Sequence, residues 1–370
     1  MMFARADTYA PSPAIPMPSI SSANFRYPTW VSRDGIELWS WSQTFLWRSL
    51  NDGATWDTVR TFDHGVSGVQ QYVGGPYDGE LLVTINPGLS VKGTLWRSVG
   101  YSRATGIADS WAMLLETSTA GAYFSGDWNL WVEDGGEIVL AGEYGTKGTP
   151  NARYVWRSTD GGDTFTPIFD WSGEGKHVHG VSYDRWWDRV WAVFGDAPHR
   201  GIAYTDNWRD PSPTWTWVST TIQPVGILPM PDAVCFGSDD GANGVYSLPR
   251  AANSREAVPS VLRSPAFRVN TATTLQVITS QMFWRGEGFP ALFGFAGVPG
   301  VAAAGEVLAS WDGLVFHRLF RDTVAVSGGG VFRAVGPTAA GNIVGMLSDG
   351  RQSSASRLVL PAPSWQPTAW

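Results

Sequence analysis

The sequence contains only one cysteine, Cys235. A single thiol cannot form an intramolecular disulfide, and a zinc-finger type of site needs several cysteine or histidine ligands at close spacing. We therefore expect no metal and no cofactor. The fold has to be held together by packing and hydrogen bonds.

Positive charge is also scarce. The chain has only three lysines, Lys92, Lys147 and Lys176, and its 26 basic residues face 33 acidic ones, which gives a net charge of −7. Such a chain has no basic field that would attract phosphate backbones or anionic lipid headgroups. Nucleic acid is therefore not an expected partner.

Long apolar runs are missing as well. Nowhere do about 18 apolar residues follow one another, so no membrane insertion is predicted. Residues 1–20 lack an apolar core of signal-peptide length, so we predict no signal peptide and a soluble protein. Residues 1–22 form instead a predicted extended Pro-rich arm, and residues 23–370 a single domain. The arm either completes the fold or reaches a partner, and the sequence leaves both open.

Glycine and tryptophan, by contrast, are abundant, and a short motif recurs among them. The run Leu46-Trp47-Arg48-Ser49 returns at 95–98 and, with valine first, at 155–158. An Asp-Gly hairpin signal precedes the first two copies, at 34–35 and 78–79. Recurrence at such intervals is typical of repeated small sheets.

Each repeat reads as four short strands joined by tight turns, with no long helical period. This pattern predicts an all-β fold, a β-propeller of four-stranded antiparallel blades. Seven blades are expected, or six if the last unit contributes its strands to a neighbour. The predicted blades span residues 25–62, 67–117, 122–171, 177–220, 222–270, 273–321 and 323–370.

A second motif follows the third predicted strand of several blades. Its pattern is Ser-x-Asp-x-Gly-x-Thr-Trp/Phe, in which the carboxylate accepts backbone N–H groups, glycine permits positive φ and the aromatic ring packs onto the sheet. An expanded copy is expected at Thr205 and Asp206, with Trp215 as its aromatic residue. The structural residues predicted in the other copies are Ser49, Asn51, Gly53 and Trp56, then Ser158, Asp160, Gly162 and Phe165, and finally Ser310, Asp312 and Phe316.

These motifs resemble the Asp-box (BNR-repeat) superfamily, whose best-known members are the sialidases. Phe25-Arg26-Tyr27-Pro28 is similar to the sialidase motif whose arginine binds the substrate carboxylate, and a bidentate guanidinium explains that preference. The family also places an acidic residue on a loop before the first box. Residues 39–46 run into the first box without a carboxylate. We therefore predict no catalytic residues, with a sialidase-like glycoside hydrolase as the alternative.

Candidate ligand-binding residues are Arg26, His177, His179, Trp186 and Trp187. Arg26 is either a ligand clamp or a structural arginine. The two histidines alternate by two, so on a strand both face the same side; they could begin a zinc site, but without a third ligand we expect hydrogen-bonded channel-lining histidines. Adjacent tryptophans could stack on sugar rings, although on a strand the two would point to opposite faces.

The segment 177–191 resembles propeller-type minor tail proteins of actinobacterial phages. That resemblance implies location in a virion tail, with other tail proteins and a host cell-wall glycan as partners and a homo-oligomer as one form of assembly. The expected function is a non-catalytic binding or structural propeller. A protein-protein scaffold in the cytoplasm is the remaining alternative.

Overall fold

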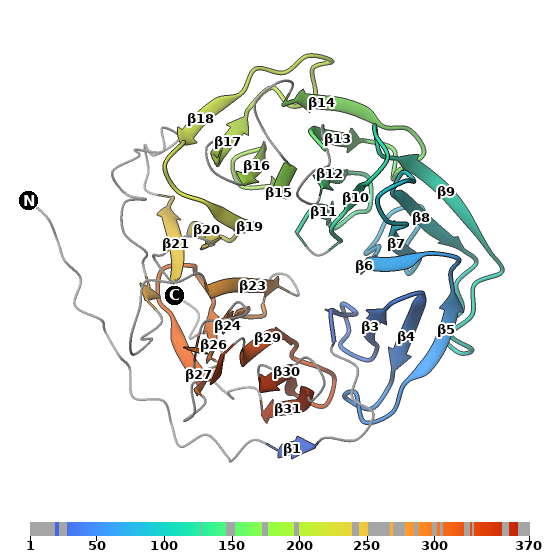
Figure 1. The fold of residues 1–370 in the computed structure, drawn as a ribbon, viewed down its shortest axis with the longest axis vertical. Helices are drawn as coiled ribbons and strands as arrows, with labels where there is room; N and C mark the ends of the chain where they lie inside the picture. Colours follow the sequence, from blue (N-terminus) through green and yellow to red (C-terminus); the bar gives the residue numbers. More distant parts are fainter. Residues whose placement is uncertain are drawn as a thin grey trace, which may run out of the picture. The chain divides into compact units, whose positions relative to one another are not determined.

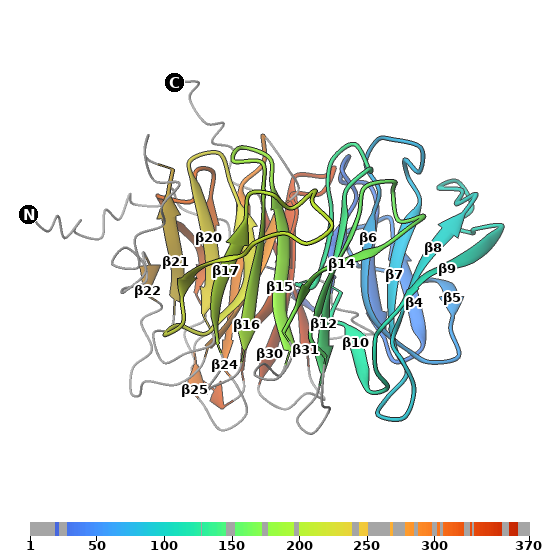
Figure 2. The same ribbon diagram turned by 90° about the horizontal axis from the view of Figure 1, so that it is seen from above.

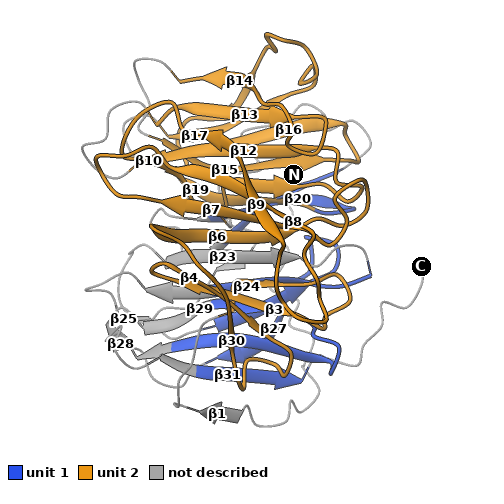
Figure 3. Cartoon of the chain, turned by 90° about the vertical axis from the view of Figure 1, so that its right-hand side faces the viewer, with its two compact units in different colours: residues 1–25, 230–370 blue, residues 26–229 orange. Residues whose placement is uncertain are grey.

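The computed structural model describes residues 19–21, 28–126, 128–145, 152–171, 177–195, 200–238, 244–250, 267–268, 278–284, 288–297, 302–303, 306–321, 326–327, 329–349 and 355–361. The chain divides into two compact units (Figure 3). Unit 1 comprises residues 1–25 and 230–370, and unit 2 comprises residues 26–229.

Every regular element among the described residues is a β-strand (Figure 1). The strands form small antiparallel sheets that follow one another along the chain, and the fold is a seven-bladed β-propeller. The sequence-based prediction of an all-β propeller with seven blades is confirmed. No helix in the described part of the chain is long and apolar enough to cross a membrane.

Unit 2 contains the first four blades, each with its strands in chain order. Blade 3 differs because two short strands, β10 and β11, both pair with β12. The strands of blades 1 and 2 are β2 (Trp30–Val31), β3 (Leu38–Ser42), β4 (Phe45–Ser49), β5 (Asp57–Thr61), β6 (Gly65–Gln71), β7 (Leu81–Asn86), β8 (Thr94–Val99) and β9 (Ser110–Glu116). Those of blades 3 and 4 are β10 (Ala122–Phe124), β11 (Leu130–Val132), β12 (Val139–Gly145), β13 (Tyr154–Ser158), β14 (Thr166–Asp170), β15 (His177–Asp184), β16 (Arg189–Gly195), β17 (Gly201–Thr205) and β18 (Thr216–Ser219). The unit ends with β19 (Pro224–Pro229).

Unit 1 contains the remaining strands. These are β20 (Ala233–Ser238), β21 (Gly244–Pro249), β22 (Phe267–Arg268), β23 (Ile278–Trp284), β24 (Ala291–Gly297), β26 (Glu306–Ser310), β27 (His317–Arg321), β29 (Gly329–Val335), β30 (Asn342–Asp349) and β31 (Ala355–Pro361), with a small pair formed by β25 (Ala302–Ala303) and β28 (Val326–Ser327). The last blade takes only β29, β30 and β31 from the C-terminal region. Its fourth strand is β1 (Ser19–Ser21), which pairs antiparallel with β31. Part of the predicted arm thus belongs to a sheet, while residues 1–18 lie outside the described residues.

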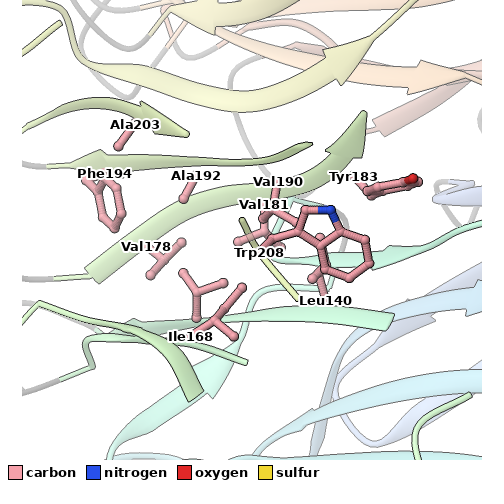
Figure 4. Packing of buried hydrophobic residues seen from close by; sticks show 11 residues of the cluster. Leu140, Ile168, Val178, Val181, Tyr183, Val190, Ala192, Phe194, Ala203 and Trp208 are labelled. Carbon is pink, nitrogen blue, oxygen red and sulfur yellow. The ribbon is translucent and has the colours of Figure 1, made fainter. Parts of the chain in front are cut away.

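The two inner strands of blade 4 are buried along their whole length. Every residue of β15 and β16 is buried, whereas the outer strands β5 and β9 are mostly exposed or half-buried. Both faces of an inner strand are covered, because each blade packs against the next. Figure 4 shows this packing between blades 3 and 4, where Leu140 and Ile168 meet Val178, Val181 and Trp208.

Glu306 in unit 1 is an acidic residue whose side chain is fully buried. Glu306 at the start of β26 has no exposed side-chain surface, and Arg318 and Arg321 on β27 each place Nε 3.3 Å from one of its carboxylate oxygens. Burial raises the pKa of Glu306 to about 7, although the positive charge of Arg321 opposes the shift. The folded state therefore holds this proton more tightly than the unfolded chain does.

We predict that the stability contributed by Glu306 is fully present below its ordinary pKa of 4.5 and is lost as the pH rises through about 7. Glu306→Gln removes the titration. The difference in unfolding free energy between the wild type and this variant should fall by up to about 3 kcal/mol between pH 4.5 and 8. Urea denaturation at a series of pH values measures it, and a difference that stays constant or rises with pH would contradict the prediction.

Candidate functional site

Two of the predicted motifs form the same hydrogen-bonded turn between the third and fourth strands of a blade. We call these Ser-Asp turns. In blade 3, Ser158 Oγ accepts a hydrogen bond from Gly162 N at 2.7 Å, and Asp160 Oδ1 accepts one from Thr164 N at 2.9 Å. Asp160 Oδ2 also accepts one from Thr164 Oγ1 at 2.6 Å. Burial opposes the effect of these bonds, which nevertheless lower the pKa of Asp160 to about 2.

The turn in blade 1 matches it atom for atom, with an amide in place of the carboxylate. Gly53 N donates to Ser49 Oγ and Thr55 N donates to Asn51 Oδ1, both at 2.9 Å. Asn51 Nδ2 donates to Thr55 Oγ1, so asparagine supplies one acceptor and one donor where Asp160 supplies two acceptors. The motif thus tolerates either residue because both offer Oδ1 to the turn.

Two further Ser-Asp turns depart from that geometry. In unit 1, Asp312 Oδ1 accepts hydrogen bonds from Leu314 N and Val315 N at 2.8 Å, which makes a tighter turn. In blade 4 the expected role of Asp206 is wrong. Asn207 Oδ1 takes that role, accepting from Thr205 Oγ1 and Thr214 N at 3.0 Å, because the acceptor stands two residues after the hydroxyl residue as in the other turns, and the expansion lies between Asn207 and Thr214.

An arginine links each of the first three blades to the next one. It comes from the third strand, at the position of the repeated Trp-Arg-Ser, and donates to a backbone carbonyl in the turn between the third and fourth strands of the following blade. Arg48 Nη1 donates to Arg103 O at 2.6 Å, and Arg97 Nη1 donates to Gly161 O at 3.1 Å. Arg157 Nη1 donates to Trp208 O. We call these side chains the linking arginines.

Acidic and aromatic side chains complete the links. Arg97 Nη2 lies 3.0 Å from Asp163 Oδ1, its guanidinium stacks 3.4 Å from the centre of the Tyr77 ring, and Tyr77 OH donates to Asp163 Oδ2 at 2.6 Å. At the first link, the buried Glu37 accepts from Arg48 Nη1 at 3.2 Å and from Tyr101 OH at 2.7 Å. Burial, reinforced by the hydrogen bond to Glu37, raises the pKa of Tyr101 above its ordinary range, so the phenol stays protonated.

The two candidate histidines lie together at the start of β15. Their Nε2 atoms are 2.8 Å apart, and His179 Nδ1 lies 3.1 Å from Pro224 O, which can only accept. Nδ1 of His179 therefore donates, and in the neutral ring its Nε2 accepts a hydrogen bond from Nε2–H of His177. The atoms that would bind a metal are thus engaged with each other. Within the described residues no group of three or more metal-ligating side chains exists.

Two tyrosines extend the histidine pair into a column of stacked rings. His177 stacks on Tyr144 with ring centres 4.1 Å apart, and Tyr144 lies 5.4 Å from Tyr123. Both tyrosines are half-buried. Burial raises the pKa of Tyr123. The column joins β10 and β12 of blade 3 to β15 of blade 4 and leaves aromatic surface at one end of these strands.

The adjacent tryptophans do not lie on a strand. Trp186 and Trp187 lie in the turn between β15 and β16, where their backbone N–H groups donate to Asp184 Oδ1 at 3.1 and 3.3 Å. The ring of Trp187 lies 4.8 Å from the guanidinium of the fully buried Arg189, which also pairs with Asp206 at 2.9 Å. Both tryptophans are half-buried, and the ring of Trp186 lies 5.9 Å from the guanidinium of Arg185.

The candidate ligand-binding residues do not form one site. His177 begins β15 and Asp184 ends it, so the histidine pair and the tryptophan turn lie at opposite ends of a strand about 25 Å long. Arg26 lies outside the described residues. What the structure brings together instead are the linking arginines and the Ser-Asp turns.

Comparisons with known proteins support the fold and leave the function open. No protein-family model matches the sequence, and no curated protein is significantly similar to it. A structure of the WD40 repeats of RRP9 is 10% identical, with a TM-score of 0.58, and the match covers 94% of this chain and 100% of that one. A chain of the mitotic checkpoint complex is 10% identical with a TM-score of 0.53 and 98% coverage of both chains. A prolyl endopeptidase matches over 50% of its own length with a TM-score of 0.50.

The two best-matched Ser-Asp turns give an internal control for the role of Asp160. At pH 7 Asp160→Asn should lose only part of the stability that Asp160→Ala loses, which is about 1 kcal/mol, because Asn51 shows that an amide can make the main hydrogen bond of the turn. Because the lowered pKa means that Asp160 stabilises the fold above its ordinary value of 3.8, the advantage of wild type over Asp160→Asn should shrink as pH falls towards 2. Thermal melts of the three proteins measure this, and equal melting temperatures for the alanine and asparagine variants would contradict it.

The linking arginines should matter more than surface ion pairs do. Arg97→Ala removes the charged donor shared by Asp163 and Gly161 O, which keep only the hydroxyl groups of Tyr77 and Tyr72, and should cost about 1.5–3 kcal/mol in unfolding free energy. Arg97→Lys should recover less than half of the lost unfolding free energy, because an ammonium group cannot donate to Gly161 O and Asp163 with the fixed geometry of the two guanidinium nitrogens. Arg209→Ala, which breaks an exposed pair with Asp188, is the matched control and should cost below about 1 kcal/mol. Equal losses for Arg97→Ala and Arg209→Ala in urea titrations would refute the assignment.

Proposed function

We propose that this chain is a non-catalytic β-propeller of a phage tail tip, which binds a host cell-wall glycan or neighbouring tail subunits. The observation that carries the proposal is the state of its buried acids. The buried acids Glu37 and Glu143 accept hydrogen bonds from groups that belong to the fold, which supports a structural role for them rather than a catalytic one.

Glu143 illustrates this state. It is fully buried, and its two oxygens accept hydrogen bonds from Ser118 N at 2.6 Å, Ser118 Oγ at 2.7 Å, Trp156 Nε1 at 3.1 Å and Arg153 N at 3.2 Å. A general acid or base must have an oxygen within reach of the proton that it transfers. Glu143 offers its lone pairs to the protein itself, and Glu37 does the same at the first interblade link.

The Ser-Asp turns and the segment 177–191 support the finer part of the proposal. The turns resemble Asp-box turns in sequence and bonding, which is a fold feature shared by enzymes and binding proteins alike. The segment 177–191 resembles phage minor tail proteins. A sialidase-like hydrolase would need Arg26 as its clamp together with an acid before the first turn, and strands β3 and β4 carry no acid in residues 39–46.

The proposal predicts attachment without turnover. Purified protein should bind sedimented actinobacterial cell walls, and an antibody raised against it should label the tail tips of virions. A panel of fluorogenic glycosides, including sialosides, should show no hydrolysis.

Digested cell walls from which the glycan has been removed are the control for glycan binding. Absence from particles together with no cell-wall binding would overturn the proposal. Turnover that is abolished by Arg26→Ala would establish the hydrolase instead, and partners recovered from a cell lysate independently of glycan would favour the scaffold alternative.

A further inference from the structure

Exposed apolar side chains are concentrated in the first two blades. Among the described residues, eight large hydrophobic side chains are exposed, and Trp217 is the only one outside blades 1 and 2. Scattered single residues of this kind are ordinary on a protein surface, but a concentration of them marks an interaction site. The seven in blades 1 and 2 are Ile36, Leu50, Leu89, Val91, Val99, Ile107 and Met113.

Four of the seven lie at one end of the two blades. Ile36 is 46% exposed, Leu50 52%, Val99 42% and Ile107 61%. Ile36, Leu50 and Ile107 belong to the turns between β2 and β3, between β4 and β5, and between β8 and β9, and Val99 is the last residue of β8. We call these four side chains the turn patch.

Hydrogen bonds of Arg48 connect these three turns. Arg48, which precedes Leu50 by two residues, bonds to Arg103 O and to Glu37 at 2.6 and 3.2 Å. A Cβ on Gly106, next to Ile107, would lie 2.6 Å from the Arg48 guanidinium. The turns that carry the turn patch thus pack on Arg48, the linking arginine between blades 1 and 2.

Two more of the seven lie at the other end of blade 2. Leu89 is 73% exposed, the largest value in this set, and Val91 is 45% exposed. Leu89 and Val91 belong to the loop 87–92, which precedes β8. Val99 ends β8 and Ile107 lies in the turn after it, at the opposite end of the strand. The six residues of β8 separate the two ends by about 20 Å. Figure 2 shows β6, β7 and β8 side by side between these ends.

The two ends also differ in charge. The turns that carry the turn patch contain three exposed or half-buried aspartates, Asp34, Asp52 and Asp109, and the exposed Asp57 begins β5 beside them. Two arginines, Arg33 and Arg103, lie in the same turns, and Arg103 pairs with Asp34. The loop 87–92 carries a single charge, the exposed Lys92. An apolar loop tip with one cation thus stands at one end of the blade, and an apolar patch with an acidic rim stands at the other.

We propose that the loop 87–92 of one copy of this chain docks on the turn patch of a second copy. Leu89 and Val91 would pack on Ile36, Leu50 and Ile107, and Lys92 would face the acidic rim. The two surfaces are different and lie at opposite ends of the same blade. The contact is therefore head to tail, and each added copy presents a fresh loop or a fresh patch to the next.

This inference rests on the proposed function in one respect, because it names one neighbouring subunit of the assembly as another copy of the chain. It does not involve the histidine column or the tryptophan turn. Glycan binding and self-association can therefore fail independently of each other.

Two variants test the two surfaces separately. Leu89→Asp places a charge on the loop and Leu50→Asp places one in the turn patch, both at exposed positions. Met113→Asp is the matched control, because Met113 is 50% exposed on β9 and belongs to neither surface. Sedimentation velocity over a range of concentrations should show association of the wild type and of Met113→Asp, and a self-association Kd raised at least tenfold in each of the other two.

Mixing the two impaired variants gives the sharper result. A head-to-tail contact leaves each variant with one intact surface, so an equimolar mixture should form a dimer and nothing larger. Lys92→Glu should weaken association of the wild type and Lys92→Arg should preserve it. Circular dichroism and melting temperature confirm that each variant is folded.

A wild type that stays monomeric at the highest concentration would overturn the inference, as would a mixture that stays monomeric while each variant is folded. Cell-wall binding by the monomeric variants, measured in parallel, reports on the proposed function alone. If they bind walls while the mixture fails to dimerise, only the head-to-tail contact is wrong.

Discussion

The hydrogen bond from an arginine on the third strand of one blade to a carbonyl in the next blade is the contact on which the first half of the fold depends. Blades are small sheets with apolar side chains on both faces, and apolar packing alone is non-directional. A guanidinium that must meet one carbonyl fixes how far each blade slides along its neighbour. Arg48, Arg97 and Arg157 repeat this constraint three times in succession.

The Ser-Asp turns make those carbonyls available. In blade 3 the side chains of Ser158 and Asp160 satisfy the backbone N–H groups inside the turn, which leaves Gly161 O directed at Arg97 and also at Tyr72 OH, 2.8 Å away. The Ser-Asp turn of blade 3 thus also provides the carbonyl that binds the linking arginine of blade 2. The buried acids Glu37 and Glu143 serve the fold in a similar way, because their oxygens accept hydrogen bonds from neighbouring strands and loops.

The fold was predictable from sequence because its signals are local. Hairpin dipeptides, strand-length apolar runs and the recurring Trp-Arg-Ser each act within a few residues, and together they gave the blades and their number. The sites were not predictable in the same way. The partner of Arg97 lies more than 60 residues away, so its role needed coordinates. The role expected of Asp206 belongs to Asn207, which stands two residues after Thr205 as the motif requires. Trp186 and Trp187 lie in a four-residue turn, which strand periodicity cannot locate.

The pairing of β1 with β31 has a consequence for how the protein is made. β1 is synthesised long before β31, so the last blade cannot be completed until β31 has left the ribosome. Until then β30 is an edge strand with unpaired backbone groups that a chaperone or a neighbouring nascent chain can occupy.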